Sequence, residues 1–260
     1  MAKNPMIRFF RSLRLRLLTE NRFSKYLLYA IGEIVLVVIG ILIALQINDA
    51  NDTRKERVKE VNYLENIKTD LQINIHEMDR YLSIRTGCIE AAQRIIAHFE
   101  GEPITDYDAF NADGVSIYGW QKFYQSNNTF QELVNSGNLA LISNQSIKTM
   151  LLDLESLYKK MKSEEDHFRF DTETLIYEPL YELMDLQQLV NNFEYKASGG
   201  ESGEEVILTA EFFEGYLKSQ KLKNGFAMTI LEFGTINGQM REMKRMSEVL
   251  IASIDMEIAK

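Results

Sequence analysis

The sequence predicts an all-α protein with one transmembrane helix near its N-terminus, followed by a helical bundle that contains long antiparallel helices. Three observations lead to this fold class. A run of 21 residues close to the N-terminus carries a single charge. Over most of the remaining chain, apolar residues recur at the three- and four-residue spacing of helices. The 260 residues include only three prolines, so few positions oppose helix formation.

The first 25 residues are expected to form a basic arm. They carry seven basic side chains and one acid, although the whole chain has a net charge of -9. Apolar residues recur between the arginines at helical spacing, which predicts an amphipathic helix on anionic lipid headgroups. A disordered basic tail that only sets the orientation is the alternative. The arginines expected at the membrane surface are Arg8, Arg11, Arg14 and Arg16.

The apolar run from Leu27 to Ile47 is long enough to span a bilayer, because about 20 helical residues cover roughly 30 Å. It is longer than the apolar region of a signal peptide and lacks a small-residue cleavage site, so we expect an uncleaved anchor. Basic residues precede the run and mixed charges follow it, which keeps the N-terminus in the cytoplasm. We therefore assign residues 1–25 to a cytoplasmic arm, 26–48 to the transmembrane helix and 49–260 to a domain on the other side.

One face of this helix combines an acid with small residues. Glu33, Val37, Gly40 and Ala44 follow one another at steps of four, three and four. An ionised carboxylate at this depth costs several kcal/mol unless it is paired, hydrated or protonated. Small residues such as Gly40 and Ala44 allow close approach of a second helix. The face is either a helix contact or a proton-linked site, or Glu33 is solvated near the inner headgroups.

Beyond residue 49 the helical pattern is nearly continuous. A first stripe ends before Gly101 and Pro103, and residues 101–128 have the composition of a loop with short elements. Thr129 and Glu132 then fit a capping box, with Thr129 as the N-cap. The apolar stripe of the first long helix comprises Val58, Val61, Leu64, Ile67, Leu71, Ile75, Met78 and Leu82.

Further helices are expected from residue 143 to about 189, near 208–220 and near 224–258, with Pro179 as a break in the first of these. A flexible loop is expected near residues 191–206, where glycines and serines cluster. Because the first and last long helices have similar lengths, we expect them to pair in antiparallel orientation.

No recognised catalytic pattern occurs in the sequence. There is no phosphate-binding glycine loop, dinucleotide fingerprint or serine nucleophile elbow. His76, His98 and His167 have no metal-ligand spacing, so exposed helix faces explain them better. The single cysteine, Cys88, excludes an internal disulfide and is expected to be a small buried hydrophobe. The aromatic residues around Trp120 are interpreted as core, and we expect no enzyme activity, cofactor or metal site.

Three segments of the chain have a recognisable pattern, namely Ile7–Arg11, Lys25–Asn48 and Phe130–Ile142. They resemble an uncharacterised family of small single-pass inner-membrane proteins of Bacteroidota. Members of that family often carry Asn-Trp after Gln-Ile-Asn, whereas this chain has Asp49-Ala50. The family has no known function, so the resemblance implies architecture and location only. It implies a Gram-negative inner membrane and therefore a periplasmic helical domain.

The leading hypothesis is a non-enzymatic assembly or interaction module of the cell envelope. Its expected partners are the lipid bilayer and either a second copy of the chain or another envelope membrane protein. The acidic domain argues against nucleic acid. One alternative is an accessory subunit coupled to the ion-motive force through Glu33, since the layout resembles ExbD- and MotB-type proteins. Another is a sensory input domain without its own output domain, and an unrecognised hydrolase is the least favoured.

Overall fold

The architecture comes from a computed structural model that describes residues 12, 15 and 23–260, with the backbone alone for residues 23–26. Every regular element in this described part is a helix, which confirms the all-α fold class. The chain divides into two compact units, residues 1–59 and 60–260. The four arginines predicted at the membrane surface lie outside the described residues.

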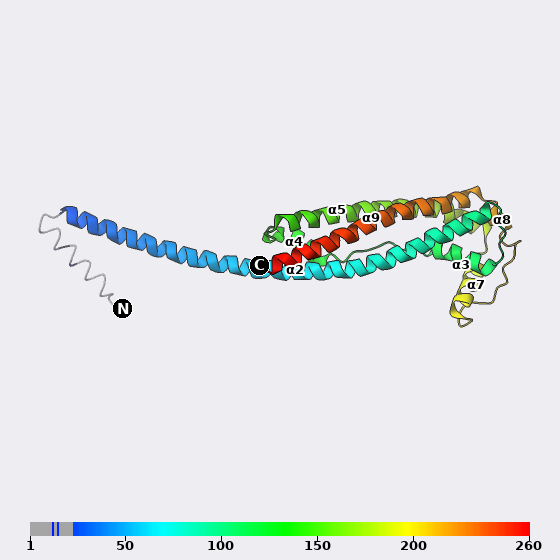
Figure 1. Ribbon diagram of the computed structural model, residues 1–260, viewed down its shortest axis with the longest axis horizontal. Coiled ribbons are helices and arrows are strands. Elements are labelled where there is room, and N and C mark those ends of the chain that lie inside the picture. The colour runs from blue at the N-terminus through cyan, green and yellow to red at the C-terminus, as the bar shows by residue number, and fades with distance from the viewer. Residues whose placement is uncertain (1–11, 13–14, 16–22) are drawn as a thin grey trace. The chain divides into compact units, whose positions relative to one another are not determined.

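The described part of the first unit consists mainly of the N-terminal portion of helix α2, which begins at Phe23 and ends at Phe99 (Figure 1). Within the described residues, α2 is the one helix that is long and apolar enough to cross a membrane. All side chains from Ile31 to Asn51 are exposed, including a dense series of Leu, Ile and Val. The predicted long apolar helix near the N-terminus is therefore present.

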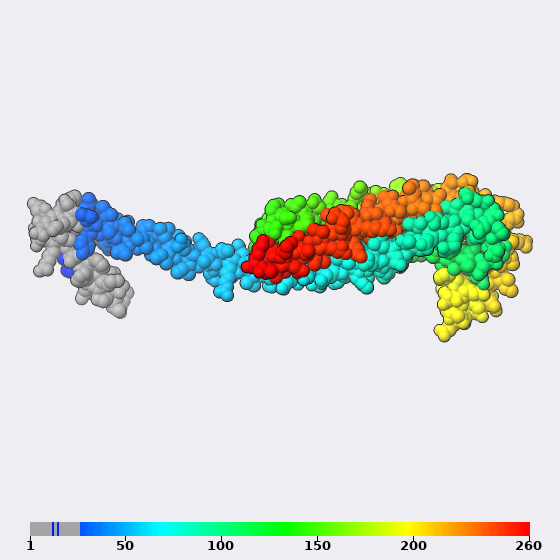
Figure 2. Space-filling view, viewed as in Figure 1, coloured from blue at the N-terminus to red at the C-terminus, as the bar shows by residue number. Residues whose placement is uncertain are grey.

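The second unit is built around three long helices, namely the remainder of α2, α5 (Gln145–Thr172) and α9 (Gln220–Ile258). Figures 1 and 2 show α9 lying against both α5 and α2. In each ion pair that joins α2, or Glu100 directly after it, to α9, the two residue numbers add to the same total, so the two helices run antiparallel in one constant register, as predicted. These pairs are Lys68–Asp255 at 2.5 Å, Asp79–Lys244 at 2.6 Å and Glu100–Lys223 at 3.2 Å.

The buried positions of α2 alternate at spacings of three and four, the repeat of a coiled coil. The predicted apolar stripe is only partly correct: Val58 is exposed, while Ile75 and Leu82 are half-buried at the edges of the core. The stripe is only partly correct because four polar or amphipathic residues occupy core positions of α2. A search for apolar residues alone does not find them. The buried series is Glu60, Leu64, Ile67, Leu71, Asn74, Met78, Tyr81, Arg85 and Cys88.

Shorter helices connect and cover the bundle. They are α3 (Tyr107–Tyr118), α4 (Asn128–Asn135), the 3-10 turn η1 (Asn138–Leu141), the π-helical turn η2 (Glu173–Tyr177), α6 (Glu178–Leu183), α7 (Leu186–Ser198) and α8 (Glu214–Leu217). The expected loop at 101–128 therefore contains a 12-residue helix. Asp106 starts that helix, since its side chain accepts the backbone N–H groups of Asp108 and Ala109.

The predicted capping box at Thr129 is wrong. Helix α4 begins one residue earlier, at Asn128, and its N-cap Asn127 makes no side-chain capping bond. The Thr129 N–H donates instead to Asp70 Oδ2 at 3.4 Å, and Glu132 accepts the Tyr63 hydroxyl at 2.8 Å. Both groups of the expected box are thus used by α2, a tertiary contact that local sequence does not reveal.

The predicted break at Pro179 is also wrong. Helical structure continues through η2 into α6, with Pro179 in the first turn of α6. The Glu178 N–H bonds to the Glu173 carbonyl five residues back, so the π-helical turn directly precedes the proline. The chain leaves the helix at Met184, which is extended, and Asp185 then caps α7.

The expected loop near 191–206 is shorter than predicted, because α7 continues to Ser198 and ends at Gly199 in a left-handed conformation (φ 68°). Asn192 is buried and donates to the Asp108 carboxylate at 2.8 Å, which holds α7 to α3. The helix expected near 208–220 is reduced to the four residues of α8.

Candidate functional site

Residues 120–127, here called the strap, run without regular secondary structure between α3 and α4. Between the two ends of the strap, which bond to α3 and α4, the backbone N–H and C=O groups are not part of a helix, and buried backbone groups need partners. Side chains of α2 and α5 supply those partners, at positions where a three-helix bundle normally carries apolar residues. The strap and these side chains form a polar region inside the described bundle.

At one end the strap is held by Arg85 of α2 and by Glu165 and Lys162 of α5. Glu165 Oε1 accepts the Phe123 N–H at 3.0 Å and a hydrogen bond from Arg85 Nη2. Lys162 Nζ donates to the Phe123 carbonyl at 2.9 Å and to Glu165 Oε2 at 2.6 Å. Two side chains of α5 therefore pair both backbone groups of Phe123, as a neighbouring strand would.

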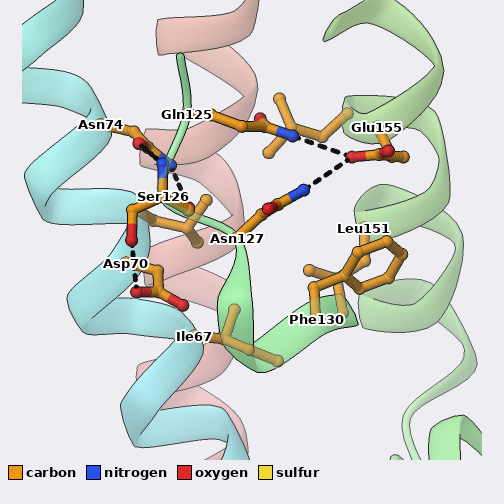
Figure 3. A pocket seen from close by; sticks show the side chains of 11 residues that line it. Ile67, Asp70, Asn74, Gln125, Ser126, Asn127, Phe130, Leu151 and Glu155 are labelled. Carbon is orange, nitrogen blue, oxygen red and sulfur yellow. Dashed lines mark hydrogen bonds between the residues drawn. The ribbon is translucent and has the colours of Figure 1, made fainter. Parts of the chain in front are cut away.

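At the other end of the strap, Asn74 of α2 pairs both backbone groups of Ser126. Its Oδ1 accepts the Ser126 N–H at 2.6 Å, and its Nδ2 donates to the Ser126 carbonyl at 2.7 Å. The Ser126 hydroxyl donates to Asp70 Oδ1 at 2.9 Å. From α5, Glu155 Oε2 accepts the Gln125 side-chain amide at 2.8 Å. Figure 3 shows these groups approaching the strap from the two helices.

Arg85, Lys162 and Glu165 are here called the first clamp, and Asp70, Asn74 and Glu155 the second clamp. A small cavity of about 30 Å³ lies beside the second clamp. A volume of this size holds about one water molecule, so it is too small for an organic substrate. Polar and apolar walls meet there. The lining comprises Ile67, Asp70, Leu71, Asn74, Gln125, Ser126, Asn127, Phe130, Leu151, Leu154 and Glu155.

The charged groups of the first clamp are deeply buried. The side chains of Arg85 and Glu165 are 2% and 0% exposed. Two cations face one carboxylate, and Arg85 Nε and Nη1 are buried without a hydrogen-bond partner among the described residues. A buried ion pair of this kind adds little stability over an apolar core, but breaking it is costly because it leaves one charge unpaired. Its evident role is to fix the strap in one position.

Two aromatic residues of the strap pack against rings of α2 and α5. Phe123 is fully buried and meets the Tyr81 ring edge-on at 5.5 Å, while Trp120 meets Phe168 at 4.7 Å. The interpretation of this aromatic cluster as core is thus correct for Phe123, which is buried, and for Tyr118 and Trp120, which are partly buried against the core. Tyr124 is the exception, since it is 71% exposed with Lys162 Nζ 4.1 Å from its ring centroid.

Cys88 is buried, free and hydrogen-bonded to the Ser116 carbonyl at 3.4 Å, as expected for a small core residue. Burial raises the pKa of its thiol to about 11, with a small opposing effect of the nearby Arg85 charge. The thiolate is the nucleophilic form of cysteine, so this thiol is poorly suited to catalysis near neutral pH.

The predicted face of the apolar helix lies entirely in the first unit. Glu33, Val37, Gly40 and Ala44 are all exposed on α2, and apart from the adjacent helix backbone Gly40 has no atom within 4 Å of the position a Cβ would take. Glu33 lies beside Ala30, Ile34, Val37 and Val38 on the surface of α2.

The histidines have different environments. His76 is exposed on α2, and His98 Nδ1 lies 2.9 Å from the Glu102 carbonyl oxygen. His167 of α5 instead lies beside Asp171 and the α9 residue Glu232, and one ligand atom of each lies within 4.8 Å of the others. The four-residue spacing of His167 and Asp171 was visible in the sequence, but Glu232 is 65 positions from His167 and required the tertiary fold.

Comparison with known proteins gives one result. Residues 33–168 match the sequence pattern of a family of unknown function, DUF6090. That stretch includes most of the apolar helix, the strap and every side chain that clamps it. No curated protein and no solved structure matches the chain. Because the match covers more than half of the 260 residues, the protein is a member of the DUF6090 family.

Proposed function

We propose that this protein is a membrane-anchored, non-enzymatic interaction module of the bacterial cell envelope. In this proposal α2 crosses the inner membrane once, the basic N-terminal arm stays in the cytoplasm, and the helical bundle lies in the periplasm. The bundle then presents its surface to a second copy or to another envelope membrane protein.

The exposed apolar part of α2 carries the proposal. No residue in its most apolar window is buried, whereas the core helix of a soluble protein would be mostly buried. Soluble proteins rarely expose continuous apolar surface of this extent, because each buried Å² of such surface gains about 25 cal/mol. A lipid bilayer covers such a segment along its whole length.

Orientation is tested with two reporter fusions to the C-terminus of the full chain. Alkaline phosphatase, which is active only outside the cytoplasm, is expected to be active, and a fluorescent protein that folds only in the cytoplasm is expected to be dark. The reverse pattern contradicts the periplasmic placement. Recovery of the chain in the soluble fraction after alkaline carbonate washing contradicts the anchor itself.

The interaction role is supported by the strap, which the buried polar side chains of α2 and α5 hold in place on the bundle. Cross-linking in native membranes followed by purification is expected to yield either a dimer of the chain or a complex with one envelope protein. A chain that stays monomeric at micromolar concentration in mild detergent, and that cross-links to nothing in native membranes, contradicts the proposal.

A second candidate function is an accessory subunit that uses the ion-motive force. The observation that favours it is the position of Glu33 within the apolar part of α2, since an acid in a membrane span commonly marks an ion path or a helix contact. Glu33→Gln is expected to abolish the cellular function in this case while membrane insertion stays normal. Ile34→Leu is the matched control, because it changes the neighbouring side chain without removing the acid.

A further inference from the structure

Three metal-ligating side chains meet where α5 packs against α9. His167 and Asp171 are four residues apart on α5 and so share one helix face. Glu232 approaches them from α9, and one ligand atom of each residue lies within 4.8 Å of those of the other two. His167 Nδ1 and Glu232 Oε1 are 2.6 Å apart. The cluster lies outside the clamps of the strap.

The helices that carry these ligands are fixed at this level of the bundle. Phe168 and Phe233 directly follow His167 and Glu232 in sequence, and both are buried. Their ring centroids are 4.3 Å apart, so the two helices pack tightly beside the cluster. Ligands on packed helices keep their geometry better than ligands on loops.

Glu232 has an environment that favours a cation. Its side chain is only 11% exposed, and its Oε2 is buried with no hydrogen-bond partner among the described residues. Burial raises the pKa of this carboxyl, His167 opposes part of that rise, and the nearby acids Asp171 and Glu164 add to it. A buried carboxylate oxygen without a partner is costly, and a bound cation would remove that cost.

We propose that His167, Asp171 and Glu232 bind one transition-metal dication of the Zn²⁺ class, which joins α5 to α9. One imidazole and two carboxylates suit Zn²⁺, whereas Mg²⁺ and Ca²⁺ take oxygen ligands alone. Ligand atoms about 2.1 Å from a tetrahedral metal lie roughly 3.4 Å apart. The His167 side chain is 61% exposed and free to rotate into that geometry. Water takes the fourth position.

This site extends the proposed function and does not depend on it. His167 lies within the segment that matches the family, while Asp171 and Glu232 lie beyond it. A metal at this position therefore fastens the family segment to the C-terminal helix of the bundle.

The test uses the full chain in detergent micelles, freed of metal by a chelator and then titrated with Zn²⁺ or Co²⁺. We expect one ion per chain and the visible absorption bands of tetrahedral Co²⁺. At a Zn²⁺ concentration 100 times the Kd, the Tm should rise by about 5–10 °C. Absence of stoichiometric binding, or equally tight binding of Mg²⁺, overturns the proposal.

Variants then locate the ion. His167→Ala and Asp171→Asn should each weaken Zn²⁺ binding by at least about 100-fold, because loss of even an outer-shell partner costs 10–100-fold. His76→Ala is the matched control, since this exposed histidine lies on α2, and binding should not change. Both ligand variants alter accessible side chains, and circular dichroism verifies that they fold. Equal binding by His167→Ala and the unaltered chain overturns the assignment.

Discussion

Single polar residues decide how the middle of this bundle is built. Glu165 is fully buried and yet pairs with a guanidinium, an ammonium and a backbone N–H at the same time. If the carboxylate were removed, Arg85 would lose its anionic partner and the Phe123 N–H would lose its hydrogen-bond acceptor. The residue therefore joins three segments, namely α2, α5 and the strap, through one buried carboxylate.

Glu165→Ala is expected to lower the free energy of unfolding by about 3–5 kcal/mol, because it leaves the buried Arg85 charge unpaired. Urea denaturation followed by circular dichroism measures the change. Asp166→Ala is the control, since its 66% exposed carboxylate pairs with Lys122 at the surface and should contribute at most about 1 kcal/mol. Equal losses in the two variants would show that burial of Glu165 is not what matters.

The buried thiol of Cys88 should make the stability of the fold depend on pH. The folded pKa of its thiol, about 11, is above its ordinary value of 9.0, so the folded state binds this proton more tightly than the unfolded state. The corresponding stabilisation is present below pH 9 and is lost as the pH rises from about 9 towards 11. At pH 8 a thiol reagent should label the native chain slowly and the urea-unfolded chain rapidly. Rapid labelling of the native chain would contradict the burial of this thiol.

Among the helices, α9 and the π-helical turn η2 approach each other closely at Gly225. A Cβ at Gly225 would lie 2.6 Å from Ile176 Cγ1 and 3.1 Å from the Leu175 carbonyl oxygen. Glycine is therefore required for α9 to reach η2. Gly234 lies on the same helix with nothing within 4 Å of its Cβ position, so it has no such role.

These two glycines form a matched pair. Gly225→Ala should destabilise the bundle by about 1–3 kcal/mol through overpacking. Gly234→Ala should stabilise it by up to about 1 kcal/mol, because alanine favours the helix. Thermal unfolding of the two variants measures both signs. A gain in stability for Gly225→Ala would mean that α9 and η2 are further apart than described.

The sequence was sufficient for the elements whose apolar residues follow a helical repeat. The end of α2 near Gly101, the start of α5 near Ser143 and α9 from residue 224 onward were predicted on that basis. The strap and its clamps were not, because Asn74, Arg85 and Glu165 are polar residues at core positions and periodicity treats them as surface. Only the tertiary fold shows that each pairs with the backbone of residues 121–126.

For the whole molecule, the segment that matches the family is not a complete bundle. Residues 33–168 contain the core faces of α2 and most of α5, but those faces pack against α9. The buried face of α9 includes Leu222, Phe226, Phe233, Ile236, Met240, Met243, Leu250 and Ile254. Without α9, the apolar faces of α2 and α5 that pack against it would be exposed to water.

A chain truncated after residue 219 should therefore lose cooperative thermal unfolding, as measured by circular dichroism in detergent. A chain truncated after residue 258, which keeps all of α9, should melt as the full chain does. A cooperative transition in the shorter chain would show that α2 and α5 form a stable unit by themselves.

The constant register of the ion pairs between α2 and α9 also constrains how relatives of this protein can change in length. An insertion or deletion in one long helix displaces every later pair along that helix, unless the opposite helix changes by the same amount. Changes of seven residues keep the buried positions on the same face, whereas three or four residues alone shift them around the helix. Across the family, gaps in α2 beyond residue 60 should thus be accompanied by equal gaps in α9, in units of seven. An alignment of many members decides this.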